Sequence, residues 1–139
     1  MGVHAELPLH YTLTAPALPT APRLCRDFVR AVLVASGLDQ LAETAAMCTS
    51  ELVTNVHRHG KGDVRLAATI ECARVRVTVH DDGPALPSPR RAASDDINGR
   101  GLFLVTALSD VVGLTIDEPS EGTGKAVWFE LNVPPENAV

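Results

Sequence analysis

The chain has 139 residues, the length of one ordinary domain and too short for two well-formed cores. Hydrophobic residues make up 45% and charged residues 21%, as in soluble globular proteins, and no apolar run approaches the length of a transmembrane helix. The net charge of −5 argues against non-specific binding to nucleic acid or membranes, so we expect a single cytoplasmic domain over residues 1–139.

The first part of the chain combines one strand with two helices. Alternating apolar residues predict a half-buried strand over residues 6–14. After several prolines, apolar residues at helical spacing predict a helix over residues 23–36 that Gly37 ends. A longer helix is expected over residues 39–60, with Asp39 as its N-cap and Gly60 as its stop.

Next, the pattern predicts an antiparallel hairpin. Its strands cover residues 63–71 and 74–80, and each alternates apolar and polar side chains. The periodicity then disappears in a Pro-rich stretch over residues 82–98, and a loop of this length is usually functional or disordered. A helix should begin near Gly99 and run towards Asp110.

Two final strands are expected over residues 111–117 and 125–133. Trp128 alternates to the outer side, where it would lie on the sheet surface or contact a partner. Strand pairs with short turns, and helices that all need one sheet face, predict an α+β fold. We expect a two-layer sandwich with a mixed, mostly antiparallel sheet and the helices on one face.

The three cysteines, Cys25, Cys48 and Cys72, are far apart in the sequence. They lack the paired spacing of a zinc site or a disulfide framework. We therefore expect buried, reduced thiols.

The long helix over residues 39–60 carries the first candidate site. Glu51, Asn55 and Arg58 share its polar side, and its opposite, apolar side contains Ala42, Ala45, Thr49, Leu52, Val53 and Val56. A carboxylate and an amide one turn apart can hold a hydrated cation and activate a hydroxyl or water. An ordinary solvated helix face is the commoner explanation for such a pattern on its own.

Asp81 is the most informative single residue. Counting in steps of two from Val75, Val77 and Val79 places its side chain on the apolar face, where a carboxylate needs a hydrogen-bond donor. The exocyclic amine of adenine is such a donor, and Gly83 leaves room for a flat ring. A β-turn that the first Asp caps explains the D-D-G-P stretch equally well.

Two glycine motifs complete the candidate site. Gly99, Arg100, Gly101 and Leu102 open a helix, where backbone amides and the helix dipole favour phosphate. Thr123, between two glycines, has the parity of the inward residues of the last strand and can join Asp81 around a base. Taken singly, each motif is commoner as a simple turn.

Together, four motifs resemble a known family in order and spacing. These are E-L-V-T-N at residues 51–55, D-D-G at 81–83, G-R-G-L at 99–102 and G-T-G at 122–124. They are similar to the N, G1, G2 and G3 boxes of the Bergerat-fold ATPases, which include gyrase, histidine kinases and anti-sigma-factor serine kinases. The sequence around the first motif looks most like the anti-sigma-factor kinases. A histidine kinase is a poorer match, because too few residues precede the first strand to form a phosphoacceptor hairpin.

The resemblance implies a role for each matching residue. Glu51 would be the general base that prepares an attacking hydroxyl, and Asn55 would bind Mg²⁺ that bridges the ATP phosphates. Arg58 lies beside them and is expected to contact the nucleotide. Asp81 would recognise the adenine amine, with Gly83 giving clearance.

The remaining motifs would complete the nucleotide site. Thr123 would support the adenine contact, and the motif at residues 99–102 would hold the phosphates. The Pro-rich segment over residues 84–98 would be the ATP lid. Ala85 stands where the family has a second glycine, which puts the lid hinge in doubt.

The expected function is an ATP-dependent, Mg²⁺-assisted protein serine kinase and anti-sigma factor. It would bind a sigma factor, phosphorylate an antagonist protein on Ser and so regulate transcription by partner switching. It would not contact nucleic acid or membranes directly, and a homodimer is left open. The alternatives are a non-catalytic ATP-binding regulatory module and an adaptor that binds no nucleotide.

Overall fold

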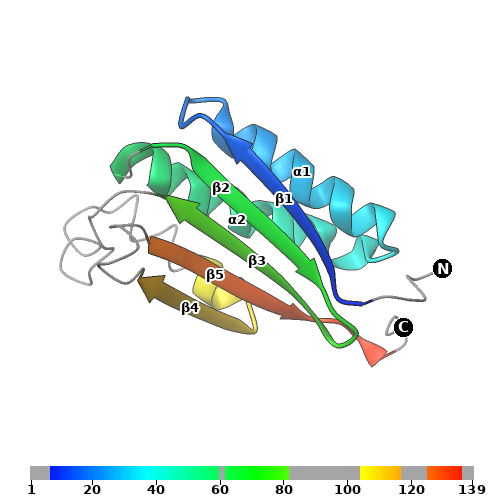
Figure 1. Cartoon of the computed structure of the whole chain (residues 1–139). Coiled ribbons are helices and arrows are strands. Elements are labelled where there is room, and N and C mark those ends of the chain that lie inside the picture. Colours follow the sequence, from blue (N-terminus) through cyan, green and yellow to red (C-terminus); the bar gives the residue numbers. More distant parts are fainter. Residues whose placement is uncertain (1–6, 60–61, 82–103, 117–124, 136–139) are drawn as a thin grey trace.

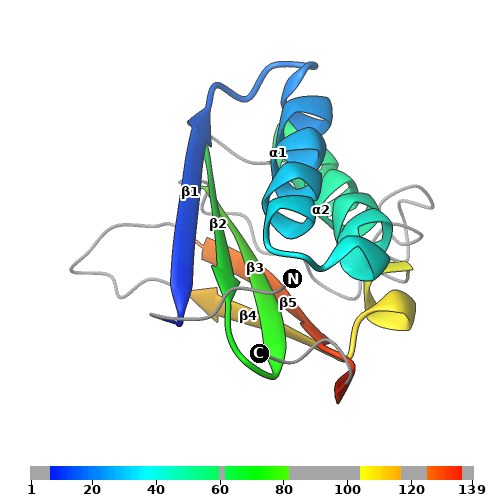
Figure 2. The same ribbon diagram turned by 90° about the vertical axis from the view of Figure 1, so that its right-hand side faces the viewer.

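The computed structural model describes residues 7–59, 62–81, 104–116 and 125–135, without the side chains of residues 57–59 and 116. An open five-stranded sheet forms one layer, and two long helices on one of its faces form the other (Figures 1 and 2). The elements are β1 (Leu9–Ala15), α1 (Ala21–Ala35), α2 (Asp39–His59), β2 (Val64–Ile70), β3 (Arg74–Asp81), β4 (Val111–Ile116) and β5 (Lys125–Asn132). This arrangement confirms the predicted α+β sandwich.

The strand order in the sheet is β1-β2-β3-β5-β4, so the last strand lies between β3 and β4. All four pairings are antiparallel, which refines the expected mixed sheet for this part of the chain. The predicted hairpin is formed by β2 and β3. Residues 104–108 add a short helical segment from the predicted third helix.

The core lies between the sheet and the two helices. Alternate residues of β2 and β3 are buried as predicted, namely Val64, Leu66, Ala68, Ile70, Val75, Val77 and Val79. The apolar sides of α1 and α2 cover them, and Phe129 of β5 is completely buried among them. Each fully buried Val, Leu or Phe side chain contributes about 1.5–3 kcal/mol relative to exposure.

The helix ends differ slightly from the prediction. α1 begins at Ala21, before Pro22, because a proline in the first turn has no N–H that the helix would use. Gly37 ends α1 as predicted: its φ is 77°, and the Leu38 N–H donates to the Leu33 carbonyl at 2.8 Å. Asp39 lies within the first turn of α2, not at its cap.

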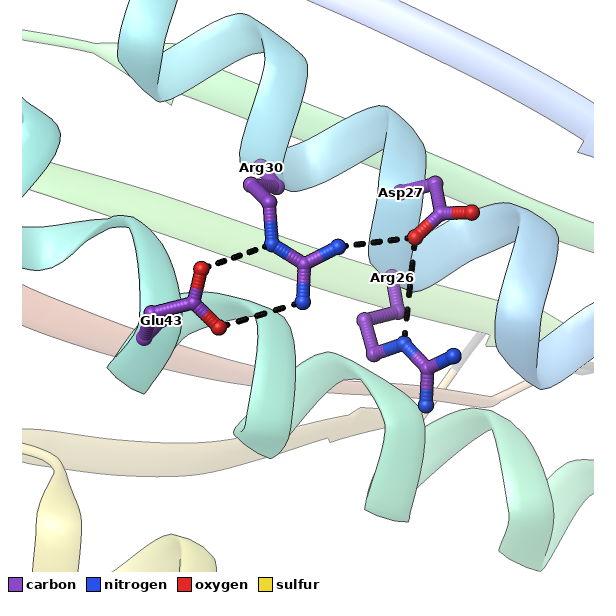
Figure 3. Close-up of polar contacts among 4 residues, drawn as sticks. All are labelled: Arg26, Asp27, Arg30 and Glu43. Atoms are coloured by element: carbon purple, nitrogen blue, oxygen red, sulfur yellow. Dashed lines mark hydrogen bonds and ion pairs between the residues drawn. The ribbon is translucent and has the colours of Figure 1, made fainter.

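α1 and α2 are joined on their exposed surfaces by a cluster of charges (Figure 3). Arg30 donates to the two Glu43 carboxylate oxygens at 2.8 and 3.1 Å, and to Asp27 at 2.8 Å. Arg26 lies near Asp27, at 3.8 Å. Of these contacts, only the one between Arg30 and Glu43 links the two helices, and because it is exposed it adds little to the apolar packing that holds α1 and α2 in place.

The cysteine prediction is correct for two residues and wrong for the third. Cys25 and Cys48 are buried, and burial raises the pKa of the Cys25 thiol to about 11. Cys72 is exposed because it lies in the turn between β2 and β3, beyond the cover of the helices. None of the helices within the described ranges has the length and apolar character needed to cross a bilayer.

Candidate functional site

The polar residues of α2 lie at the border of the core. Glu51 and Asn55 are both half-buried, one helical turn apart. Leu52, Val53 and Val56 are buried on the other side of the helix and hold its orientation against the sheet. The carboxylate and the amide therefore do not belong to a fully solvated face.

Asp81 faces the helix layer, as the alternation along β3 predicts. Its side chain is only 2% exposed, and it pairs with Lys125, the first residue of β5, whose side chain is 8% exposed. The Lys125 Nζ lies 3.2 Å from Oδ2 and 3.4 Å from Oδ1 of Asp81. The ammonium is thus a donor for a carboxylate that burial would otherwise penalise heavily.

The ends of several elements meet around this pair. Asp81 ends β3 directly opposite Lys125, and β4 ends opposite Lys125 on the other side. The start of β2 pairs with the end of β3, and α2 ends shortly before β2 begins. In Figure 1 the last turns of α2, the tip of β3 and the start of β5 all lie at the left of the sheet. The half of α2 that carries Asn55 is therefore at the same end of the molecule as Asp81.

The segment that follows the glycine motif at residues 99–102 packs beside α2. Val105 is completely buried, and Ser109 Oγ lies 3.7 Å from Cys48 Sγ. Burial raises the pKa of the Cys48 thiol, the Ser109 hydrogen bond opposes the rise, and the charge of Glu51 adds to it. Glu51 and this segment therefore both lie close to Cys48. The candidate phosphate motif at residues 99–102 precedes it in the sequence.

The other candidate residues lie outside the described residues. These are Gly83, Gly99, Arg100, Gly101, Leu102 and Thr123, together with the expected lid over residues 84–98. Arg58 belongs to α2, but its side chain is not described. The structure therefore places Asp81 and the α2 end that carries Asn55 at the same end of the molecule, and the roles of the site residues stay predictions.

The family model of the histidine kinase-like ATPase domain matches residues 15–131, which include β2, β3, β4, β5 up to its penultimate residue and the last residue of β1. The chain belongs to this family. The resemblance drawn from the four motifs is thereby confirmed at the level of the superfamily. ATP is accordingly the ligand expected for a histidine kinase-like ATPase domain.

Thirteen chains of solved structures match this ATPase domain. One belongs to the crystal structure of the RsbU and RsbW domains of Rv1364c from Mycobacterium tuberculosis, with a TM-score of 0.67 and 21% identity. The match covers 91% of this chain and 33% of that chain, so this chain spans about a third of the length of the chain it matches. At this identity the likeness shows the fold alone. No curated protein matches.

Among the described residues, Lys125 is a neighbour of Asp81 in this ATPase domain that was not predicted from the sequence. Lys125 was predicted only as the start of a strand, yet its ammonium is the buried partner of Asp81. The signal was present, because Lys125 has the same parity as the inward residues Val127 and Phe129. A lysine on an apolar strand face needs a partner as much as an aspartate does.

Proposed function

We propose that this chain is an ATP-dependent protein serine kinase of the anti-sigma-factor type. It acts in the cytoplasm, binds a sigma factor and phosphorylates an antagonist protein on Ser, so that the two partners exchange and transcription is regulated. The proposal rests on one observation in a chain of the histidine kinase-like ATPase family: Asp81 and the α2 end that carries Asn55 lie at the same end of the molecule.

Asp81 recognises the base in this proposal. Its carboxylate is buried, ionisable and directed towards the helix layer at the end of the sheet. A buried carboxylate is a strong acceptor for an exocyclic amine because little water competes for it. Gly83 and Thr123 would complete the base pocket from the sequence stretches next to Asp81 and Lys125.

Asn55 serves the phosphates, one helical turn from the proposed general base Glu51. Mg²⁺ prefers oxygen ligands and is usually bound by few protein groups together with phosphate oxygens and water. The side-chain amide of the half-buried Asn55 would supply one such oxygen. When bound, Mg²⁺ supplies neutralisation of the phosphate charge. Arg58 and the motif formed by Gly99, Arg100, Gly101 and Leu102 would hold the remaining phosphate oxygens.

Glu51 is the general base of the transfer. The Ser hydroxyl oxygen forms a bond to the γ-phosphorus, the bond from that phosphorus to the β–γ bridging oxygen breaks, and ADP leaves. The hydroxyl proton goes to the Glu51 carboxylate. The half-buried position of Glu51 supports this role, since it is shielded on one side and accessible on the other.

Nucleotide binding is tested first by thermal unfolding with and without Mg-ATP. A ligand at a hundred times its dissociation constant adds about 2.7 kcal/mol to the free energy of unfolding. A clear rise in melting temperature supports the proposal. No shift at millimolar Mg-ATP contradicts it and favours an adaptor without nucleotide.

Catalysis is tested with labelled ATP, candidate sigma factors and antagonist domains. Glu51→Ala should lower phosphorylation of the antagonist by about 10²–10⁴-fold while ATP affinity is kept. Glu43→Ala, on the exposed side of the same helix, is the matched control and should phosphorylate normally. If the wild-type protein binds ATP and both partners but transfers no phosphate, the chain is a non-catalytic ATP-binding regulatory module.

A further inference from the structure

The Asp81–Lys125 pair places an acceptor and a donor side by side on the inner sheet face. The two residues are opposite each other across β3 and β5, and their charged atoms are 3.2 Å apart. Counted over the whole residue, backbone included, Asp81 is 1% exposed and Lys125 is 6% exposed. Both charges thus lie away from bulk water, at the end of the sheet where the Asn55 end of α2 also lies.

Fold stability alone is a poor reason for this pair. The other inward positions of β5 carry Val127, Phe129 and Leu131, which bury apolar surface against the helices. Replacing a buried ion pair by apolar side chains of similar volume is often neutral or stabilising. Two charges at the site end of an otherwise apolar strand face therefore point to a ligand that both of them contact.

The chemistry of the pair matches one edge of adenine. The exocyclic amine of adenine is a donor, and the neighbouring ring nitrogen N1 is an acceptor. A carboxylate has about four acceptor positions and an ammonium has three donor protons, so each member of the pair can bind its partner and the base together. A charged donor also forms a stronger hydrogen bond than a neutral group in such a buried place.

We infer that Lys125 is a base-reading residue that donates a hydrogen bond to N1 of adenine while Asp81 accepts from the exocyclic amine. This inference rests on the proposed nucleotide site and adds a specificity-determining residue to it. Lys125 and Asp81 form one recognition element, supplied by two strands that are adjacent only in the sheet. Removing the ammonium should therefore weaken recognition of one ring atom and leave the rest of the nucleotide contacts intact.

The test compares two ligands with two proteins by calorimetry in Mg²⁺ buffer. ATP and 1-deaza-ATP, in which C–H replaces N1, are titrated into the wild-type protein and into Lys125→Met. The wild-type protein should bind 1-deaza-ATP about tenfold to a hundredfold more weakly than ATP, as for loss of a hydrogen bond to a charged group. In Lys125→Met this ratio should fall to about one, since no donor faces N1.

Two controls isolate the effect. Arg76→Met removes a cation from beside a buried carboxylate on the outer face of the same sheet and should keep the wild-type ratio. 7-Deaza-ATP changes the far side of the purine and should give the same ratio to ATP in the wild-type protein and in Lys125→Met.

Three outcomes would overturn the inference. They are an equal 1-deaza penalty in wild type and Lys125→Met, tighter ATP binding by Lys125→Met, and no 1-deaza penalty in the wild-type protein. The second would mean that the lysine competes with adenine for Asp81. If Lys125→Met does not fold, Lys125→Gln takes its place: its neutral amide should show a reduced penalty, and an unchanged one contradicts the inference. Failure of the wild-type protein to bind ATP would instead defeat the proposed function itself.

Discussion

β3 and β5 bury two carboxylates on opposite faces of the same pair of strands. On the outer face, Glu130 is 5% exposed, and Arg76 holds one of its oxygens with two contacts of 2.7 and 2.8 Å. Arg74 reaches the other oxygen at 3.5 Å. On the inner face, the Lys125 ammonium lies 3.2 Å from Asp81. Glu130 is thus held by short contacts to a guanidinium group, and Asp81 by a longer contact to an ammonium group.

The surroundings of the two carboxylates differ as well. The Arg76 side chain is 43% exposed and lies over the Trp128 ring, 4.0 Å from its centroid. Its positive charge is therefore stabilised by water and by the ring as well as by Glu130. The Lys125 side chain is 8% exposed, and water reaches it little. The outer cluster links β3 and β5 across the sheet, whereas the inner pair belongs to the site proposed to bind adenine. The following experiments test that contrast.

The largest effect is expected on the inner face. Asp81→Ala leaves the Lys125 ammonium buried without its carboxylate and should lower the free energy of unfolding by about 3–5 kcal/mol. The double variant Asp81→Ala with Lys125→Met should regain most of this loss, because no uncompensated charge stays in the core. Urea unfolding of the wild-type protein, the two single variants and the double variant measures the coupling free energy between Asp81 and Lys125. Additive losses would contradict the picture of a buried, mutually dependent pair.

On the outer face the loss should be smaller. Glu130→Ala removes the acceptor of Arg76 and Arg74, whose half-exposed guanidinium groups can turn to water. We expect a cost of about 1.5–3 kcal/mol in urea unfolding. Trp128 is the only tryptophan, so its fluorescence should report the altered position of Arg76. ATP affinity should not change, and a large loss of affinity would show that the two faces are not independent.

Gly113 tests how closely the outer face is packed. It lies opposite Trp128 in the sheet, and a Cβ added there would meet Trp128 Cζ2 at 2.1 Å. Gly113→Ala must therefore displace the indole ring from beneath Arg76, at a cost of about 1–3 kcal/mol. In a Trp128→Leu background the same change should cost much less. Equal costs in the two backgrounds would mean that the ring does not limit the space.

The smallest effect concerns the exposed charges between α1 and α2. The hydrogen bond from Arg30 lowers the pKa of Glu43 below its usual value of 4.5, although desolvation opposes the shift. A carboxylate with a lowered folded-state pKa stabilises the protein above its unfolded-state pKa, and this contribution is lost as the pH falls through the folded-state value. The small stability difference between wild type and Glu43→Gln should therefore be constant near neutral pH and shrink below pH 4.5. A difference that grows on acidification would contradict the assignment.

Local sequence patterns determined which side chains of the strands and helices face the core. Alternation along residues 74–80 predicted that Asp81 faces the core, and helical spacing predicted which side of α2 is buried. Both patterns follow from the geometry of single elements, in which side chains repeat every two residues in a strand and every 3.6 in a helix. The four motifs were likewise sufficient to indicate the ATPase family, which the match over residues 15–131 confirms.

Tertiary structure alone decided which residues meet. Asp81 and Lys125 are 44 positions apart, and they meet because β5 enters the sheet between β3 and β4 in one particular register. The same register places Trp128 beside Gly113. Parity says which face a side chain takes, but the pairing of distant strands depends on how whole apolar faces pack together, and no local stretch of sequence contains that information.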